Sequence, residues 1–159
     1  MGKQRISFKI GNISTSETEI KDILKAWTAI SIAFGILLNN SDLSSSFYSN
    51  FIIASLTVGI GFLLHELGHK IVAQRYGCFA EFRSFDHMLI LALIMSFFGV
   101  IFAAPGAVMI SGHVNKIRNG KISAAGPVVN LVLALVFLAL VFIQLPSLLK
   151  SVAYYGFII

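Results

Sequence analysis

The stretch FIIASLTVGIGFLLHELGHKIVAQR, residues 51–75, decides how this chain is interpreted. Its first part is largely apolar, and its last third carries His65, Glu66 and His69. About 20 apolar residues are enough for a helix to cross a bilayer. Ionisable groups cost several kcal/mol to bury near hydrocarbon, so their presence in such a helix indicates function. We therefore expect a membrane helix over 51–75 with a functional site in its last third.

The spacing of these three residues predicts a zinc site. On a helix, His65 and His69 lie one turn apart on the same face, where both imidazoles can reach one zinc ion. Glu66 is then close enough to act as general base on a zinc-activated water, whose pKa falls to about 7. The predicted reaction is the hydrolysis of a peptide bond. The alternative is that all three groups lie hydrated at the membrane surface.

A catalytic zinc ion normally takes three protein ligands and leaves one position for water. The chain offers five further candidates for the third ligand, none of which stands out: Asp42, Glu81, Asp86, His87 and His113. Both histidines are also typical of a membrane interface, and Glu81 can pair with Arg83. From the residues alone, the third ligand stays unknown.

The composition places the chain among membrane proteins. Hydrophobic residues make up 57% of its 159 residues and charged residues 12%, about half the charged fraction usual in soluble domains. The net charge of +5 comes from Lys and Arg that flank apolar segments, which is typical of membrane anchoring rather than of nucleic-acid binding. We expect an all-α polytopic membrane protein with short β elements, forming a single core over residues 1–159.

Short patterned segments surround the helix over 51–75. Residues 1–13 alternate apolar and polar side chains, which predicts an N-terminal strand. Ser16 and Glu19 form a capping box that opens a membrane helix over 17–38. Within residues 79–110, a short strand precedes an apolar run broken at Pro105-Gly106. A last clear helix is expected over 127–145, with Pro127 in its first turn, and residues 148–159 resemble the start of a further helix.

The basic residues predict the orientation. The many Lys and Arg before residue 26 place the N-terminus in the cytoplasm, and loop 39–50 has none. The zinc motif then lies on the cytoplasmic side. A full crossing by residues 88–110 would leave Lys116, Arg118 and Lys121 outside, against the positive-inside rule. We expect this segment to enter the membrane and return, giving about three transmembrane helices plus a re-entrant segment; a full crossing is the alternative.

Asn130 is an amide in the first turns of the apolar helix over 127–145, and two interpretations are open. It can form a hydrogen bond between helices, or it can line the cavity beside the zinc and bind substrate backbone or an oxyanion. Gly126, one turn earlier, keeps that face small enough for a helix or a peptide to approach.

Together these residues resemble the site-2 protease family of intramembrane zinc metalloproteases. The resemblance covers residues from about 24 to 159. HELGHK at 65–70 resembles the family's metal motif, and GPVVN at 126–130 its second signature. AEFR at 80–83 and APGAV at 104–108 resemble stretches of archaeal members.

The resemblance implies a zinc endopeptidase that cuts transmembrane segments of other proteins within the bilayer of the cell membrane. It also implies a membrane-dipping β element that presents the substrate, for which 79–83 and 105–110 are the candidates. The family's third ligand is an aspartate in a later Asp-Gly motif, yet no Asp or Glu follows Asp86 here. We expect that ligand after Ile159, in a protein truncated before it. The chain alone is then expected to bind zinc weakly.

Two other functions are compatible with parts of the pattern. A non-catalytic membrane protein of the same fold would bind or chaperone membrane partners, although Glu66 would then have no purpose. A metal-ion transporter would need further His or acidic residues on the neighbouring helix, and residues 122–145 contain none. The expected partners are a transmembrane protein segment and the lipid bilayer, with no nucleic acid; homo-oligomerisation stays open.

Overall fold

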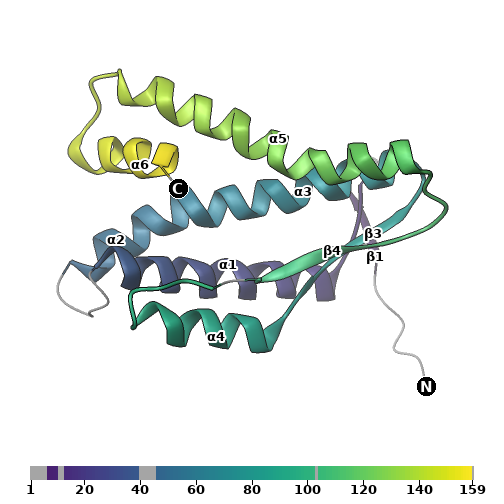
Figure 1. Ribbon diagram of the computed structural model, residues 1–159, viewed down its shortest axis with the longest axis horizontal. Helices are drawn as coiled ribbons and strands as arrows, with labels where there is room; N and C mark the ends of the chain where they lie inside the picture. Colours follow the sequence, from purple (N-terminus) through teal and green to yellow (C-terminus); the bar gives the residue numbers. More distant parts are fainter. Residues whose placement is uncertain (1–6, 11–12, 40–45, 103, 159) are drawn as a thin grey trace.

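The computed structural model describes residues 7–10, 13–39, 46–102 and 104–158. It consists mostly of helices, with two small antiparallel sheets. In Figure 1, helix α3 runs through the middle of the molecule, α5 lies above it, and α1 and α4 lie below it. The zinc motif is therefore in the central helix.

The N-terminal alternation continues through a hairpin rather than forming one strand over 1–13. Strand β1 (Ser7–Ile10) pairs with β2 (Ile13–Ser16), so that Ser7 lies opposite Ser16. Residues 1–6 and 11–12 of the predicted strand lie outside the described residues. The Gln74 amide fixes the hairpin to α3, because it accepts from Ser14 N at 3.0 Å and donates to Ser14 O at 3.0 Å.

Helix α1 spans Glu17–Leu38, the range that the capping box predicts. Ser16 has extended backbone, and its hydroxyl accepts a hydrogen bond of 3.1 Å from Glu19 N. The Glu19 side chain does not return to the Ser16 backbone as a capping box would require. It forms a buried ion pair with Lys70 instead, so the start of α1 is joined to the helix that carries the zinc motif.

A continuous helix over Phe47–Arg75 contains α2 (Phe47–Ala54), the π-helical turn η1 (Ser55–Gly59) and α3 (Ile60–Arg75). It begins one turn before the expected residue 51, because Phe47 and Tyr48 extend the apolar segment into the predicted loop. At η1, the Trp27 indole N–H donates to Ser55 O at 3.3 Å. A side chain at Gly59 would collide with Trp27, so this glycine lets α1 pack closely against the π turn.

The segment between the second pair of strands leaves the sheet and returns to it. Strand β3 (Phe79–Ser84) pairs with β4 (Gly106–Ser111), with Ser84 opposite Gly106. Helix α4 (Asp86–Ser96) leads away from β3, and the chain comes back to Pro105, whose carbonyl accepts from Phe85 N at 3.0 Å. The two ends of this excursion, which runs from Phe85 to Pro105, therefore meet beside the sheet.

An ion pair fastens the start of α4 to α1. Lys25 Nζ lies 2.5 Å from Asp86 Oδ1. The hydrogen bond from Lys25 holds the pKa of the Asp86 carboxyl below its ordinary value. Together with the apolar contacts of Leu89 and Phe82 against α1, this pair positions the excursion on one side of the molecule.

Helix α5 (Lys116–Val141) begins eleven residues before the predicted start at 127 and ends before the predicted end at 145. Asn115 caps it, because its Oδ1 accepts from Arg118 N at 2.8 Å. Pro127 therefore lies inside the helix rather than in its first turn. Helix α6 (Ser147–Ile158) follows Pro146 and packs against α5 and η1.

Two helices of the described residues are long and apolar enough to cross a membrane, by length and composition: Phe47–Arg75 and Lys116–Val141. Helix α4 is apolar but shorter. Helix α1 does not qualify, because charged residues fill its first turns. The two qualifying helices pack against each other, and the predicted site lies between them.

Candidate metal centre

The two histidines of the motif face each other on α3. Their Nε2 atoms are 3.1 Å apart, and their rings meet at an interplanar angle of 80°. Two nitrogen ligands of one tetrahedral zinc ion, each about 2.0–2.1 Å from the metal, are separated by about 3.3 Å. The pair therefore has the separation that a shared zinc ion needs.

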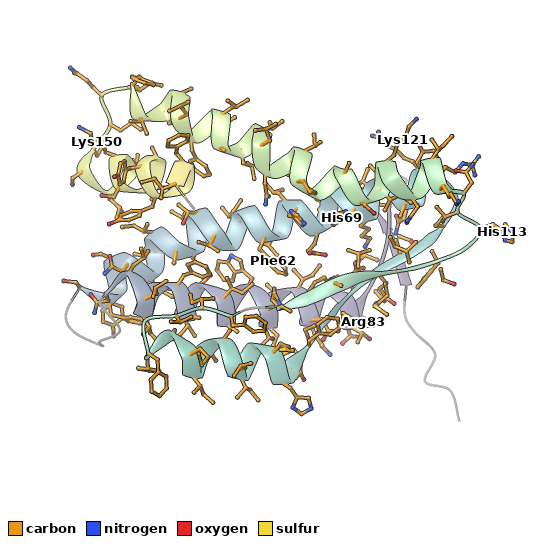
Figure 2. All side chains as sticks on the ribbon, viewed as in Figure 1. Phe62, His69, Arg83, His113, Lys121 and Lys150 are labelled. Atoms are coloured by element: carbon orange, nitrogen blue, oxygen red, sulfur yellow. The ribbon has the colours of Figure 1, made fainter. Side chains whose placement is uncertain are left out.

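A backbone contact from α5 orients one of these imidazoles. His69 Nδ1 lies 2.7 Å from the carbonyl oxygen of Ile122. Since a carbonyl can only accept, Nδ1 carries the proton and Nε2 keeps its lone pair for a metal. Figure 2 shows His69 between α3 and α5, on the side from which this contact comes. Helix α5 thus sets the tautomer of a predicted ligand.

Two glycines allow α5 to lie directly against the motif. A Cβ at Gly126 would stand 2.5 Å from His65 Nε2 and would also overlap His69 Nε2. A Cβ at Gly68 would lie 3.1 Å from the Ala125 carbonyl oxygen. Gly126 therefore preserves the space into which both Nε2 atoms point, and Gly68 permits the close approach of the two helices.

Glu66 is half-buried beside His69 and strand β4. The Val108 backbone N–H is placed to donate to its carboxylate. Glu66 and His65 also line a cavity of about 610 Å³, whose other walls come from η1, α5 and α6. A second cavity, of about 240 Å³, borders Glu66 from the side of α1 and β3. The carboxylate therefore separates two largely apolar spaces.

Asn130 lines the larger cavity together with His65 and Glu66. Its amide is exposed and is placed to interact with the His65 imidazole. His65 Nδ1 is itself buried and has no hydrogen-bond partner among the described residues. Both interpretations of Asn130 stay open, because this residue lines the cavity and also reaches from α5 to His65 on α3.

The other acidic and histidine candidates that the structure describes do not join the site. His87 and His113 are exposed, and His113 points away from the molecule in Figure 2. Glu81 is buried and is bonded to Arg83 and Ser16. Asp86 pairs with Lys25, and Asp42 lies outside the described residues. Within residues 7–10, 13–39, 46–102 and 104–158, no three His, Cys, Asp or Glu side chains form a group that could hold a metal ion.

His65 and His69 therefore fit as two ligands of a zinc site, but the described residues do not complete that site. Facing imidazole nitrogens, a fixed tautomer and an open space at Gly126 suit a small cation that binds nitrogen. A zinc site with three protein ligands would need one further ligand from outside the part of the chain that the structure describes.

A buried ion pair beside the site was not predicted from the sequence. Lys70, the residue after His69, lies 2.5 Å from Glu19, and both side chains are buried. Glu19 also accepts from Phe82 N at 2.9 Å and from Thr15 Oγ1 at 2.7 Å. A lysine inside an otherwise apolar helix was the available signal, because a buried charge requires a partner.

The chain is similar to a protein of Methanocaldococcus jannaschii named "putative zinc metalloprotease", with 46% identity over 110 residues. The match covers 67% of this chain and 58% of that relative. No family model matches the chain, and no solved structure matches it. The similarity supports a metalloprotease family.

Proposed function

We propose that this chain forms the core of an intramembrane zinc endopeptidase that hydrolyses peptide bonds within transmembrane segments of other proteins. The observation that carries the proposal is the meeting of His65 Nε2 and His69 Nε2, 3.1 Å apart, beside Glu66 at the wall of one cavity. The named relative supports the zinc protease part of the proposal. His65 and His69 would hold the zinc.

Each residue of the site then has a distinct role. Zinc, when bound, supplies a Lewis acid that makes water acidic enough to be deprotonated near neutral pH. Glu66 takes the proton of the attacking water and delivers it to the leaving amine. The Val108 N–H orients the Glu66 carboxylate, and the Ile122 carbonyl keeps His69 in the tautomer that binds metal. Asn130 donates its amide to the substrate carbonyl oxygen as negative charge develops there.

The cavity suits an apolar peptide. Besides His65, Glu66 and Asn130, its lining is mostly apolar, with Leu131 and Phe137 from α5 among the contributors. A transmembrane segment presents such side chains, and its backbone needs partners for hydrogen bonding. Strand β4 pairs with β3 on one edge, and its other edge is the natural place for an extended substrate to add a strand.

Two long apolar helices and the returning excursion support the proposed membrane arrangement. Phe47–Arg75 and Lys116–Val141 would cross the bilayer, with Arg75 and Lys116 at the cytoplasmic surface. The excursion from β3 through α4 to β4 would enter and leave the bilayer on the cytoplasmic side, because its ends meet at Ser84 and Gly106. The N-terminus and the zinc site would then lie on that side too.

Replacement of Glu66 by Gln tests the reaction. The full-length protein is reconstituted in liposomes with a single-span substrate, and cleavage and zinc content are measured together. We expect Glu66→Gln to abolish cleavage while zinc stays bound. The control is Glu17→Gln, at an exposed side chain in the first turn of α1, and it should cleave normally. Cleavage by Glu66→Gln at the normal rate would overturn the proposed base.

The lack of a third ligand among the described residues favours one alternative, a non-catalytic protein of the same fold. Under that alternative, the unmodified full-length protein would bind membrane partners without cutting them. The same liposome assay separates the two functions, because only the protease yields product.

A further inference from the structure

A second pocket, with a mostly apolar lining, lies at the end of the helix pair that is nearest the two sheets. A cavity of about 500 Å³ opens between the last turn of α3 and the first half of α5. Arg75, Tyr76 and Lys121 line its polar end, and Val72, Ala124 and Val128 contribute apolar walls. The cavity is thus cationic at one end and apolar at the other.

The cations at this cavity have no acidic partner. Arg75 and Lys121 are exposed, and neither forms an ion pair with any described residue. No Asp or Glu follows Asp86 in the sequence, so α5 contributes only positive charge at this end. Arg118 adds to it and stacks over the Tyr76 ring, 5.4 Å from its centroid. The field at the cavity mouth is positive and favours an anion.

The position of Lys121 along α5 matches the level of lipid headgroups. Residues 122–141 contain no charged side chain, and a helix of this length rises about 30 Å, the thickness of the hydrocarbon core. Lys121 therefore stands at the boundary between hydrocarbon and water when α5 crosses the bilayer. The apolar walls at Ala124 and Val128 lie one and two turns below it, at the depth of acyl chains.

We propose that this cavity binds one anionic phospholipid, with its phosphate between Arg75 and Lys121 and one acyl chain along Val72, Ala124 and Val128. Basic pockets between membrane helices recognise lipid headgroups in this way. The proposal rests on the membrane insertion given above, but it does not depend on proteolysis. A bound lipid would bridge α3 and α5 one turn from the contact of His69 with Ile122.

Native mass spectrometry of the full chain in detergent tests the site. Phosphatidylglycerol and phosphatidylcholine are added at equal concentration, and bound lipid is counted. We expect one phosphatidylglycerol to bind with a clear preference, and Arg75→Gln with Lys121→Gln to weaken it on the order of ten-fold. The matched control is Lys116→Gln with Lys150→Gln, which removes the same charge. Lys116 is the first residue of α5, and Lys150 lies at the opposite end of the molecule from Lys121 in Figure 2. This control variant should bind lipid normally.

A second variant tests the apolar half of the site without changing charge. Val128 is 55% exposed, so Val128→Trp should fold, fill the groove and reduce phosphatidylglycerol binding. Inorganic phosphate and glycerophosphate, which lack acyl chains, should not compete at the concentration of the lipid. Equal binding of both lipids, equal loss in the control pair, or full competition by inorganic phosphate would each overturn the proposal. Glu66→Gln should bind lipid as the unmodified chain does, whatever its proteolytic activity.

Discussion

Lys70 Nζ lies 2.5 Å from Glu19 Oε2, and the two side chains are only 6% and 0% exposed. Because Glu19 also accepts a hydrogen bond from Phe82 N, this one carboxylate joins α1, α3 and β3 immediately beside the zinc motif. The pair thereby fixes the position of α3 relative to the β3–β4 sheet, whose Val108 contacts Glu66. A structural ion pair thus supports the site from outside it.

Removal of one partner of the Lys70–Glu19 ion pair should destabilise the fold. Lys70→Met leaves Glu19 charged and buried, a situation that typically costs about 3–5 kcal/mol. Cys78, the sole cysteine, is 6% exposed and reports unfolding through its reaction with a thiol-specific dye. We expect Cys78 of the Lys70→Met variant to react with the dye at a clearly lower temperature than Cys78 of the unmodified protein. Lys21→Met, which breaks an exposed pair with Glu17, should not shift the transition. Identical transitions for both variants would show that the buried pair is not structural.

Gly126→Ala should impair metal binding more than folding. The added methyl group would occupy the space between the two Nε2 atoms, which the structure keeps free. Gly120→Ala is the control, because a Cβ there meets nothing within 4 Å, and alanine favours a helix. Zinc uptake measured after dialysis should fall in Gly126→Ala and stay normal in Gly120→Ala. Normal uptake by both would mean that the metal does not lie where the imidazoles point.

Asn130→Ala distinguishes the two interpretations of this amide. A donor to the developing oxyanion predicts a loss in kcat on the order of 100-fold, with little change in thermal stability. A hydrogen bond between helices predicts the reverse, a lower unfolding temperature with nearly normal turnover of the folded protein. Asn119→Ala, at the exposed start of α5, serves as the control for both measurements.

A cysteine at position 119, in a Cys78→Ser background, tests the membrane topology. With the excursion of α4 confined to the cytoplasmic side, position 119 should react with an impermeant thiol reagent only when the cytoplasmic face is accessible. Labelling of intact cells from outside would mean that residues 88–110 cross the membrane completely.

Local patterns in the sequence were enough for α1 and for the two histidines. The Ser16 cap and the apolar residues after it define α1, and four-residue spacing on a helix places His65 over His69. Strand β3 follows from the alternation at 79–83. Each of these features depends on residues that are close together in the chain.

The remaining differences arise where contacts distant in sequence decide the structure. Pro127 is typical of the first turn of a helix, but Asn115 caps that helix twelve residues before it, a signal hidden among basic residues. The Lys70–Glu19 pair joins positions 51 residues apart, which no local pattern predicts. The contact of His69 with Ile122 likewise required the packing of α5 on α3.

The most direct test of the account is the zinc content of the purified protein at a fixed free zinc concentration, together with the X-ray absorption spectrum of the bound metal. We predict zinc with nitrogen ligands from imidazole, its loss in His65→Ala and in His69→Ala, and its retention in Glu66→Gln. Zinc uptake that is unchanged when both histidines are replaced would contradict the central claim that this pair forms the metal site.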